Sequence, residues 1–141
     1  MQEKSTQELL TALSQTKDLD AFLEENRPYF RHDHLSDFLM RYMEQKGMKR
    51  TEVIRASQLG EVYAYQILNG IKYPKRDKVL CLLLAMHVTL EECQTLLKVC
   101  GYPPLYAKNE RDAMLIYAFN NNMTVMEAQE DLDQAGMELL S

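Results

Sequence analysis

The chain has 141 residues, 46% of them hydrophobic and 26% charged, which is enough to bury a core and excludes wholesale disorder. No apolar run reaches the roughly 18 residues of a membrane-spanning helix, and the polar start MQEKSTQELL is unlike a secretory signal, so we expect a cytoplasmic protein. The net charge of −5, taken alone, argues against nucleic acid as a partner.

The first part of the chain shows two short helical patterns. Ser5-x-x-Glu8 is a capping box, and it opens an amphipathic stretch that is rich in leucine. A second short helix is predicted after Asp18, and Pro28 breaks its pattern. These residues are expected to form a helical hairpin.

One long helix and two short ones are predicted next. Asp33 is suited to cap a helix in which apolar residues recur at helical spacing from Leu35 to Met43 and which Gly47 ends. Two further helices are predicted from Thr51 to Ser57 and from Glu61 to Asn69. A brief turn of three residues, 58–60, joins them.

Two more helices complete this region. Gly70 stops the preceding helix, and Pro74 follows in the loop. The segment from Arg76 to His87 is almost continuously apolar, so we expect it to be the central buried helix. Thr89-x-x-Glu92 is another capping box, which starts a helix that ends at Gly101.

The C-terminal part contains an internal repeat. Residues 76–105 and 111–140 align without a gap at an offset of 35 residues, and the capping box and the final glycine keep the same positions. The identical pairs are Arg76/Arg111, Asp77/Asp112, Leu80/Leu115, Thr89/Thr124, Glu92/Glu127, Gln94/Gln129, Leu97/Leu132, Gly101/Gly136 and Leu105/Leu140. We interpret the segments as two copies of a helical hairpin stacked against each other.

The charge is unevenly distributed along the chain. The window from Arg41 to Lys78 holds nine basic and four acidic residues, a net charge of +5, so the rest of the chain carries −10. Such asymmetry indicates a basic, anion-facing surface on an otherwise acidic body.

The segment from 49 to 80 has the layout of a DNA-reading unit, in which one helix is braced over the DNA backbone and a second enters the major groove. Small or apolar residues are placed to pack between the two helices, and polar and aromatic ones remain on the outer face of the second. These packing residues are Val53, Ile54, Leu59, Ala64, Ile67 and Leu68.

From Leu35 to Tyr102, about half of the chain resembles the phage-repressor-type, or XRE-like, regulators of bacteria and their viruses. The resemblance is carried by NGIKYP, with Gly70 and Pro74, followed by an apolar helix and a T-x-x-E helix start. This sequence departs from the family at two positions: Gln58 stands where the family usually has glycine, and Leu68 where it favours Glu or Gln.

The resemblance implies an all-α fold, with a five-helix DNA-binding domain between an N-terminal helical hairpin and an extra C-terminal one. We place the divisions at 1–33, 34–105 and 106–141. In the register of the family, base edges would be read by Glu61, Val62, Tyr65, Gln66 and Asn69. Phosphates would be contacted by Lys49, Arg50, Thr51, Lys72, Lys75 and Arg76.

Other kinds of site find little support in the sequence. Cys81, Cys93 and Cys100 lack C-x-x-C spacing and are expected to be reduced, buried thiols. His32-x-His34 has no partner at ligand spacing, so we expect no metal site. No catalytic arrangement or phosphate-binding glycine loop is present, and we expect neither an enzyme nor a cofactor.

The sequence therefore predicts a sequence-specific regulator that binds double-stranded DNA as a homodimer, since one short helix reads too few base pairs. The acidic terminal helices are candidates for self-association or for binding a protein partner. The alternative is a protein-interaction adaptor that keeps the repressor fold but has lost DNA reading. The net charge, Glu61 on the reading face and the apolar Val62 and Tyr65 beside it favour that alternative.

Overall fold

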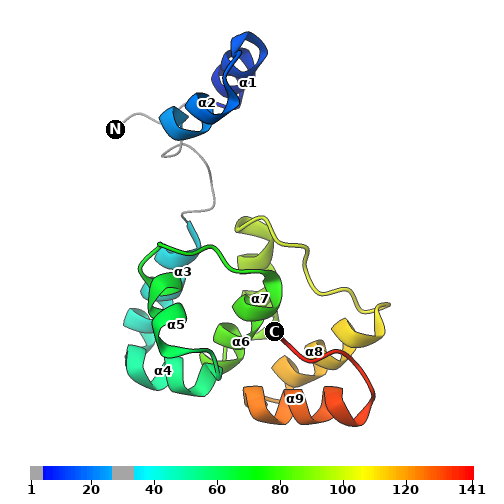
Figure 1. Ribbon diagram of the computed structural model, residues 1–141. Coiled ribbons are helices and arrows are strands. Elements are labelled where there is room, and N and C mark those ends of the chain that lie inside the picture. The colour runs from blue at the N-terminus through cyan, green and yellow to red at the C-terminus, as the bar shows by residue number, and fades with distance from the viewer. Residues whose placement is uncertain (1–4, 27–33) are drawn as a thin grey trace.

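The computed structural model describes residues 5–26 and 34–141, and within these two ranges the regular secondary structure is helical throughout (Figure 1). The helices are α1 (Thr6–Gln15), α2 (Leu19–Asn26), α3 (His34–Lys46), α4 (Arg50–Ser57), α5 (Glu61–Leu68), α6 (Arg76–Ala85), α7 (Leu90–Val99), α8 (Glu110–Asn120) and α9 (Val125–Gln134). The expected all-α class is confirmed for this part of the chain. None of these helices has the length and hydropathy of a membrane-spanning segment.

Local capping explains where several helices begin. At the start of α7, Thr89 accepts from the Glu92 N–H at 3.1 Å while the Glu92 carboxylate accepts from the Thr89 N–H at 2.8 Å. The same two bonds start α9, and at α1 the Ser5 hydroxyl accepts from the Glu8 N–H. The predicted helix break at Pro28 and the cap at Asp33 lie outside the described residues.

Three predicted boundaries need correction, the first being that of the fifth helix, which ends at Leu68 with Asn69 as its C-cap. The fourth helix begins at Arg50, one residue earlier than expected, with Lys49 as its N-cap. The sixth helix ends at Ala85 rather than at His87, and His87 has a left-handed backbone with φ of +54°. A residue in that conformation ends a helix by turning the chain away from the helix axis.

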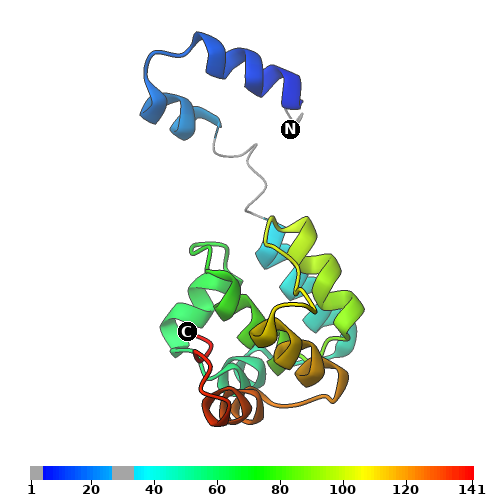
Figure 2. The same ribbon diagram turned by 90° about the vertical axis from the view of Figure 1, so that its right-hand side faces the viewer.

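Helices α3 to α9 share one hydrophobic core, with α6 at its centre. Every residue from Val79 to Leu84 is buried, because α4 packs along α6, and α7 and α9 also contact it. Helix α5 packs against α3 and α4. None of the described side chains of α1 and α2 belongs to this core, and Figures 1 and 2 draw the two helices apart from it.

The two copies of the repeat lie against each other with reciprocal contacts. Helix α6 of the first hairpin contacts α9 of the second, while α7 contacts α8 (Figure 2). The ion pairs are also reciprocal: Arg76 binds Asp112 at 2.7 Å, and Arg111 binds Asp77 at 2.8 Å. The repeat thus forms a pseudo-symmetric four-helix unit.

The polar bonds within each hairpin repeat as well. The Gln94 side-chain amide donates to the Leu105 carbonyl and accepts from its N–H, both at 2.8 Å. The Gln129 amide makes the same pair of bonds to Leu140, at 2.9 and 2.8 Å. Each glutamine therefore fixes the chain that follows its own hairpin.

The two hairpins differ in what covers them. Leu82 lies on α6, which α4 covers, and it is fully buried. Its counterpart on α8, Tyr117, is 59% exposed. The first hairpin therefore supports α3 to α5, and the second presents more of its surface to solvent.

Candidate nucleic-acid interface

Helices α4 and α5 form a compact pair joined by three residues, Gln58 to Gly60. Val53 and Ile54 of α4 and Ala64 and Ile67 of α5 are buried, as the alternation of polar and apolar residues predicts. Their packing against α6 and α3 holds both helices in place and leaves their opposite faces toward solvent.

The turn between these helices is stabilised by a buried hydroxyl. Ser57 donates to the Ile54 carbonyl at 2.6 Å and accepts from the Leu59 N–H at 3.3 Å, so its polar atom is satisfied inside the core. Gln58 has a left-handed backbone with φ of +64°, the conformation that favours glycine. Gln58 thus takes up, without glycine, the sharp change of direction between α4 and α5.

The predicted base-reading residues divide into two groups. Glu61 and Val62 are exposed in the first turn of α5, with Val62 74% exposed, and Asn69 is exposed at its C-terminal end. Tyr65 and Gln66 are only half-buried, and Tyr65 packs against the hydrophobic core. The accessible part of the predicted reading face is therefore its two ends.

Most of the predicted phosphate-contacting residues are exposed. Lys49, Arg50 and Thr51 lie at the start of α4, and Lys72 and Lys75 lie in the loop after α5. Side chains with free cationic groups near a helix pair of this kind are suited to an anionic partner.

Arg76 has another role in this structure. Besides its ion pair with Asp112, its guanidinium donates to the carbonyls of Pro103 and Pro104 at 3.1 and 3.3 Å. Because these acceptors already occupy the guanidinium, we leave Arg76 out of the candidate interface. The sequence repeat carried the signal for this role, since the pair Arg76–Asp77 recurs as Arg111–Asp112.

The loop that carries Lys72 and Lys75 is fixed at both ends. The Ile71 and Lys72 N–H groups donate to the Gln66 carbonyl at 2.8 and 3.1 Å. Farther along, the Tyr102 hydroxyl donates to the Pro74 carbonyl and the Tyr73 hydroxyl donates to the Cys100 carbonyl.

The same two tyrosines stack on each other. Their ring centroids lie 5.3 Å apart at an interplanar angle of 11°. Burial raises the pKa of both hydroxyls, so they remain donors at neutral pH. These contacts tie the loop to the end of α7. The backbone at Lys72 and Lys75 is therefore already fixed in the unbound protein.

Sequence reasoning missed two exposed apolar residues in this loop, Ile71 and Tyr73. They flank Lys72, so the candidate interface combines cations with apolar surface. Their position between Gly70 and Pro74 was the available signal, because a short loop between such residues cannot bury every side chain.

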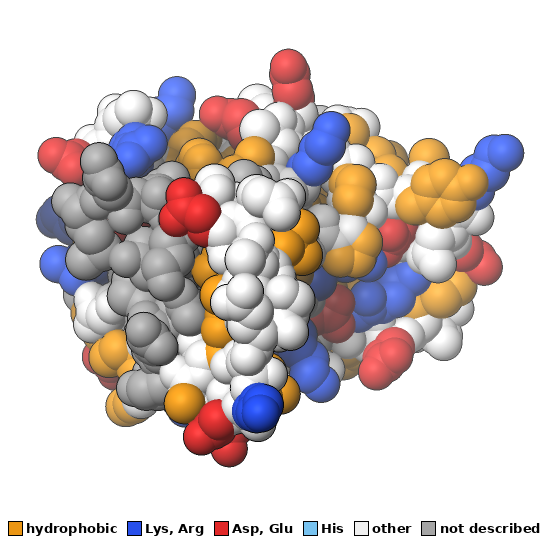
Figure 3. Space-filling model, turned by 90° about the horizontal axis from the view of Figure 1, so that it is seen from above, with side chains coloured by type: hydrophobic (Ala, Val, Ile, Leu, Met, Phe, Trp, Pro, Cys, Tyr) orange, Lys and Arg blue, Asp and Glu red, His pale blue; other side chains and the backbone are white. Residues whose placement is uncertain are grey.

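Charges of both signs are mixed on one face of the molecule (Figure 3). On the face seen in Figure 3, Lys and Arg side chains alternate with Asp and Glu rather than gathering in one area. The three cysteines are free and buried, as expected, and among the described residues no group of His, Cys, Asp and Glu is placed to hold a metal ion.

Comparison of the chain with protein-family models, with curated proteins and with solved structures gave no match.

Proposed function

We propose that the protein is a sequence-specific, double-stranded DNA-binding transcriptional regulator of the phage-repressor type, with α3 to α7 as its five-helix domain. One observation carries this proposal: α5 is held with Glu61, Val62 and Asn69 exposed, and free cations flank the α4–α5 pair in the sequence. In the proposed complex α4 braces the DNA backbone and α5 enters the major groove.

The exposed residues have distinct roles in this mechanism. Asn69 can read adenine through two hydrogen bonds, Val62 can contact a thymine methyl, and Glu61 can accept from a cytosine amine. Tyr65 and Gln66, being half-buried, act mainly at the edge of the contact. Lys49, Arg50, Lys72 and Lys75 bind phosphates, with Thr51 beside them, and so set affinity and register.

Selection from a random double-stranded DNA library tests the proposal. Two copies of the chain should enrich an inverted repeat whose half-sites lie about one helical turn apart. The variant Lys72→Glu with Lys75→Glu should enrich no site, while the matched reversal of Lys98 and Lys108, exposed lysines outside the interface, should select as the native protein does. No enrichment by the native chain would overturn the proposal.

The exposure of Val62 and Ile71 favours one competing function, a protein-interaction adaptor on the same fold. An adaptor would use the apolar part of the surface, and reversing the two lysines would leave its partner binding largely intact. Loss of DNA binding in that variant with an unchanged fold supports the regulator instead.

A further inference from the structure

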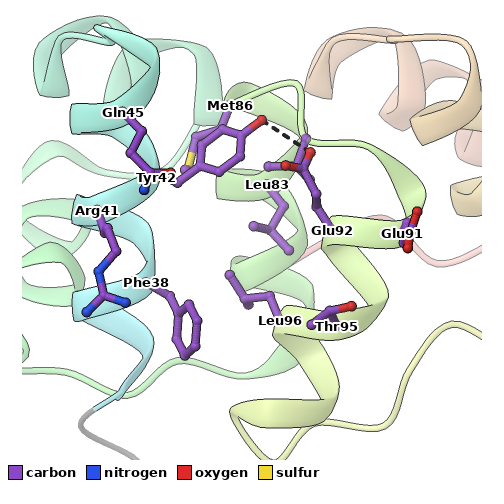
Figure 4. A pocket seen from close by; sticks show the side chains of 11 residues that line it. Phe38, Arg41, Tyr42, Gln45, Leu83, Met86, Glu91, Glu92, Thr95 and Leu96 are labelled. Atoms are coloured by element: carbon purple, nitrogen blue, oxygen red, sulfur yellow. Dashed lines mark hydrogen bonds between the residues drawn. The ribbon is translucent and has the colours of Figure 1, made fainter.

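An apolar groove of about 360 Å³ lies between α3 and α7, away from the α5 face (Figure 4). Leu83 and Met86, from α6 and its end, form its floor, and its walls include Phe38 of α3 and Leu96 of α7. At one end the Tyr42 hydroxyl donates to the Glu92 carboxylate at 3.3 Å, which bridges the two helices.

The rims of this groove are polar and carry opposite charges. Arg41 and Gln45 line it from α3, and Glu91 and Thr95 line it from α7; all four are exposed. A groove with an apolar floor and charged rims is shaped for an amphipathic helix, whose apolar side enters while polar and charged residues beside that side meet the rims.

Helix α1 has the complementary features. None of its residues is buried, and Leu10 and Leu13, at the helical spacing of one face, are 55% and 43% exposed. Lys17 follows the C-terminal end of α1 and has the charge that matches Glu91, whereas Glu8, two residues before Leu10, lies on the opposite face of the helix.

We propose that α1 of one copy docks into the α3–α7 groove of a second copy, and that the exchange is reciprocal. The choice of a second copy rests on the proposed function, since an inverted DNA site needs two reading helices. In a reciprocal exchange, the Leu10–Leu13 face of each α1 fills the groove of the other copy. No groove or leucine face is then left for a third chain, so the assembly stops at two chains.

The molar mass of the full-length chain in solution, measured by light scattering after size exclusion, tests this docking. The native protein should have the mass of two chains. Leu10→Glu with Leu13→Glu should weaken the dimer by more than about 30-fold, as loss of a central contact does. Thr95→Trp, which fills the groove from an exposed position, should do the same.

The matched control is Tyr117→Glu, a charge placed at a similarly exposed position on α8, which should remain dimeric. Circular dichroism should show equal helix content in all variants. A native protein with the mass of one chain overturns the proposal, and so does a dimer that survives either the α1 variant or the groove variant.

The outcome is separable from that of the proposed function. If the native chain selects no DNA site but both variants convert the dimer to single chains, the docking stands and the DNA-binding proposal fails. If the native chain selects DNA as a single chain, the docking fails and DNA binding stands.

Discussion

Gln58 holds a backbone conformation that glycine adopts at lower cost. Its φ of +64° costs a side-chain-bearing residue about 1 kcal/mol, so Gln58→Gly should raise the free energy of unfolding by roughly 0.5 to 1 kcal/mol. Urea unfolding measures the change.

The neighbouring glycine provides the control. Gly60 has φ of −59°, and an added Cβ would meet nothing within 4 Å, so Gly60→Ala should change stability by less than about 0.5 kcal/mol. A loss of stability in Gln58→Gly would contradict the assigned turn.

The buried thiols make a prediction about alkaline pH. Burial raises the pKa of Cys81 to about 11 and that of Cys93 to about 12, from an ordinary value of 9.0. The folded state thus favours the neutral thiol, and the stability this contributes is complete below the ordinary pKa and is lost as the pH rises through the folded values. The free energy of unfolding should fall by about 1 kcal/mol per pH unit for each thiol between pH 9 and its folded pKa, about 11 for Cys81 and about 12 for Cys93.

The test compares slopes rather than absolute stabilities. Cys81→Ala loses packing at every pH, but its free energy of unfolding should fall less steeply between about pH 9 and 11 than that of the native chain. Equal slopes in both proteins would show that the Cys81 thiol does not titrate as its burial requires.

At the scale of elements, the two hairpins are held by ion pairs of unequal burial. The Asp112 side chain is nearly buried and also accepts from the Tyr106 N–H, whereas Asp77 is more exposed. Arg76→Ala should therefore cost about 3 kcal/mol, because it strands a buried carboxylate, and Arg111→Ala about 1 kcal/mol.

A double-mutant cycle on Arg76 and Asp112 isolates the pair itself. The loss in the double variant should be smaller than the sum of the two single losses by more than about 1 kcal/mol. Additive losses, or equal costs for Arg76→Ala and Arg111→Ala, would contradict the assigned difference in burial.

The sequence predicted these elements better than it predicted their ends. Capping boxes at Thr89 and Thr124 and helical apolar spacing are local signals, and the helices they predict are present. His87 was predicted as the last residue of the helix, because a histidine that ends an apolar run is typical of a last helical turn, whereas it lies beyond the helix in the left-handed conformation. Its counterpart Asn122, with φ of +51°, is a residue type that marks helix ends in this conformation, so the repeat held the missing signal.

The candidate site was harder to predict, because residues far away in the sequence decide whether its side chains are exposed and unpaired. Exposure of Lys72 and Lys75 follows from the loop composition, but Arg76 is removed from the interface by Asp112, which lies 36 residues away. Likewise, Tyr65 packs against a core whose other members come from helices α3 to α9 and the segments between them. Neither fact is visible in a local pattern.

At the scale of the whole molecule, function depends on where charge lies rather than on its total. The chain carries −5 overall, yet Lys49, Arg50, Lys72 and Lys75 flank the α4–α5 pair as exposed cations. Exposed cations beside the proposed reading helix can attract an anionic polymer despite the net charge, which is consistent with DNA as the proposed partner.

The salt dependence of DNA binding tests that account most directly. If the four cations each contact one phosphate, the logarithm of the association constant should fall with the logarithm of the salt concentration at a slope of about −3 to −4 per chain. The milder variant Lys72→Ala with Lys75→Ala removes two phosphate contacts without adding negative charge and should reduce the steepness by about 2, and Lys98→Ala with Lys108→Ala should leave it unchanged. Flat or undetectable binding at about 50 mM salt would contradict DNA binding by this surface.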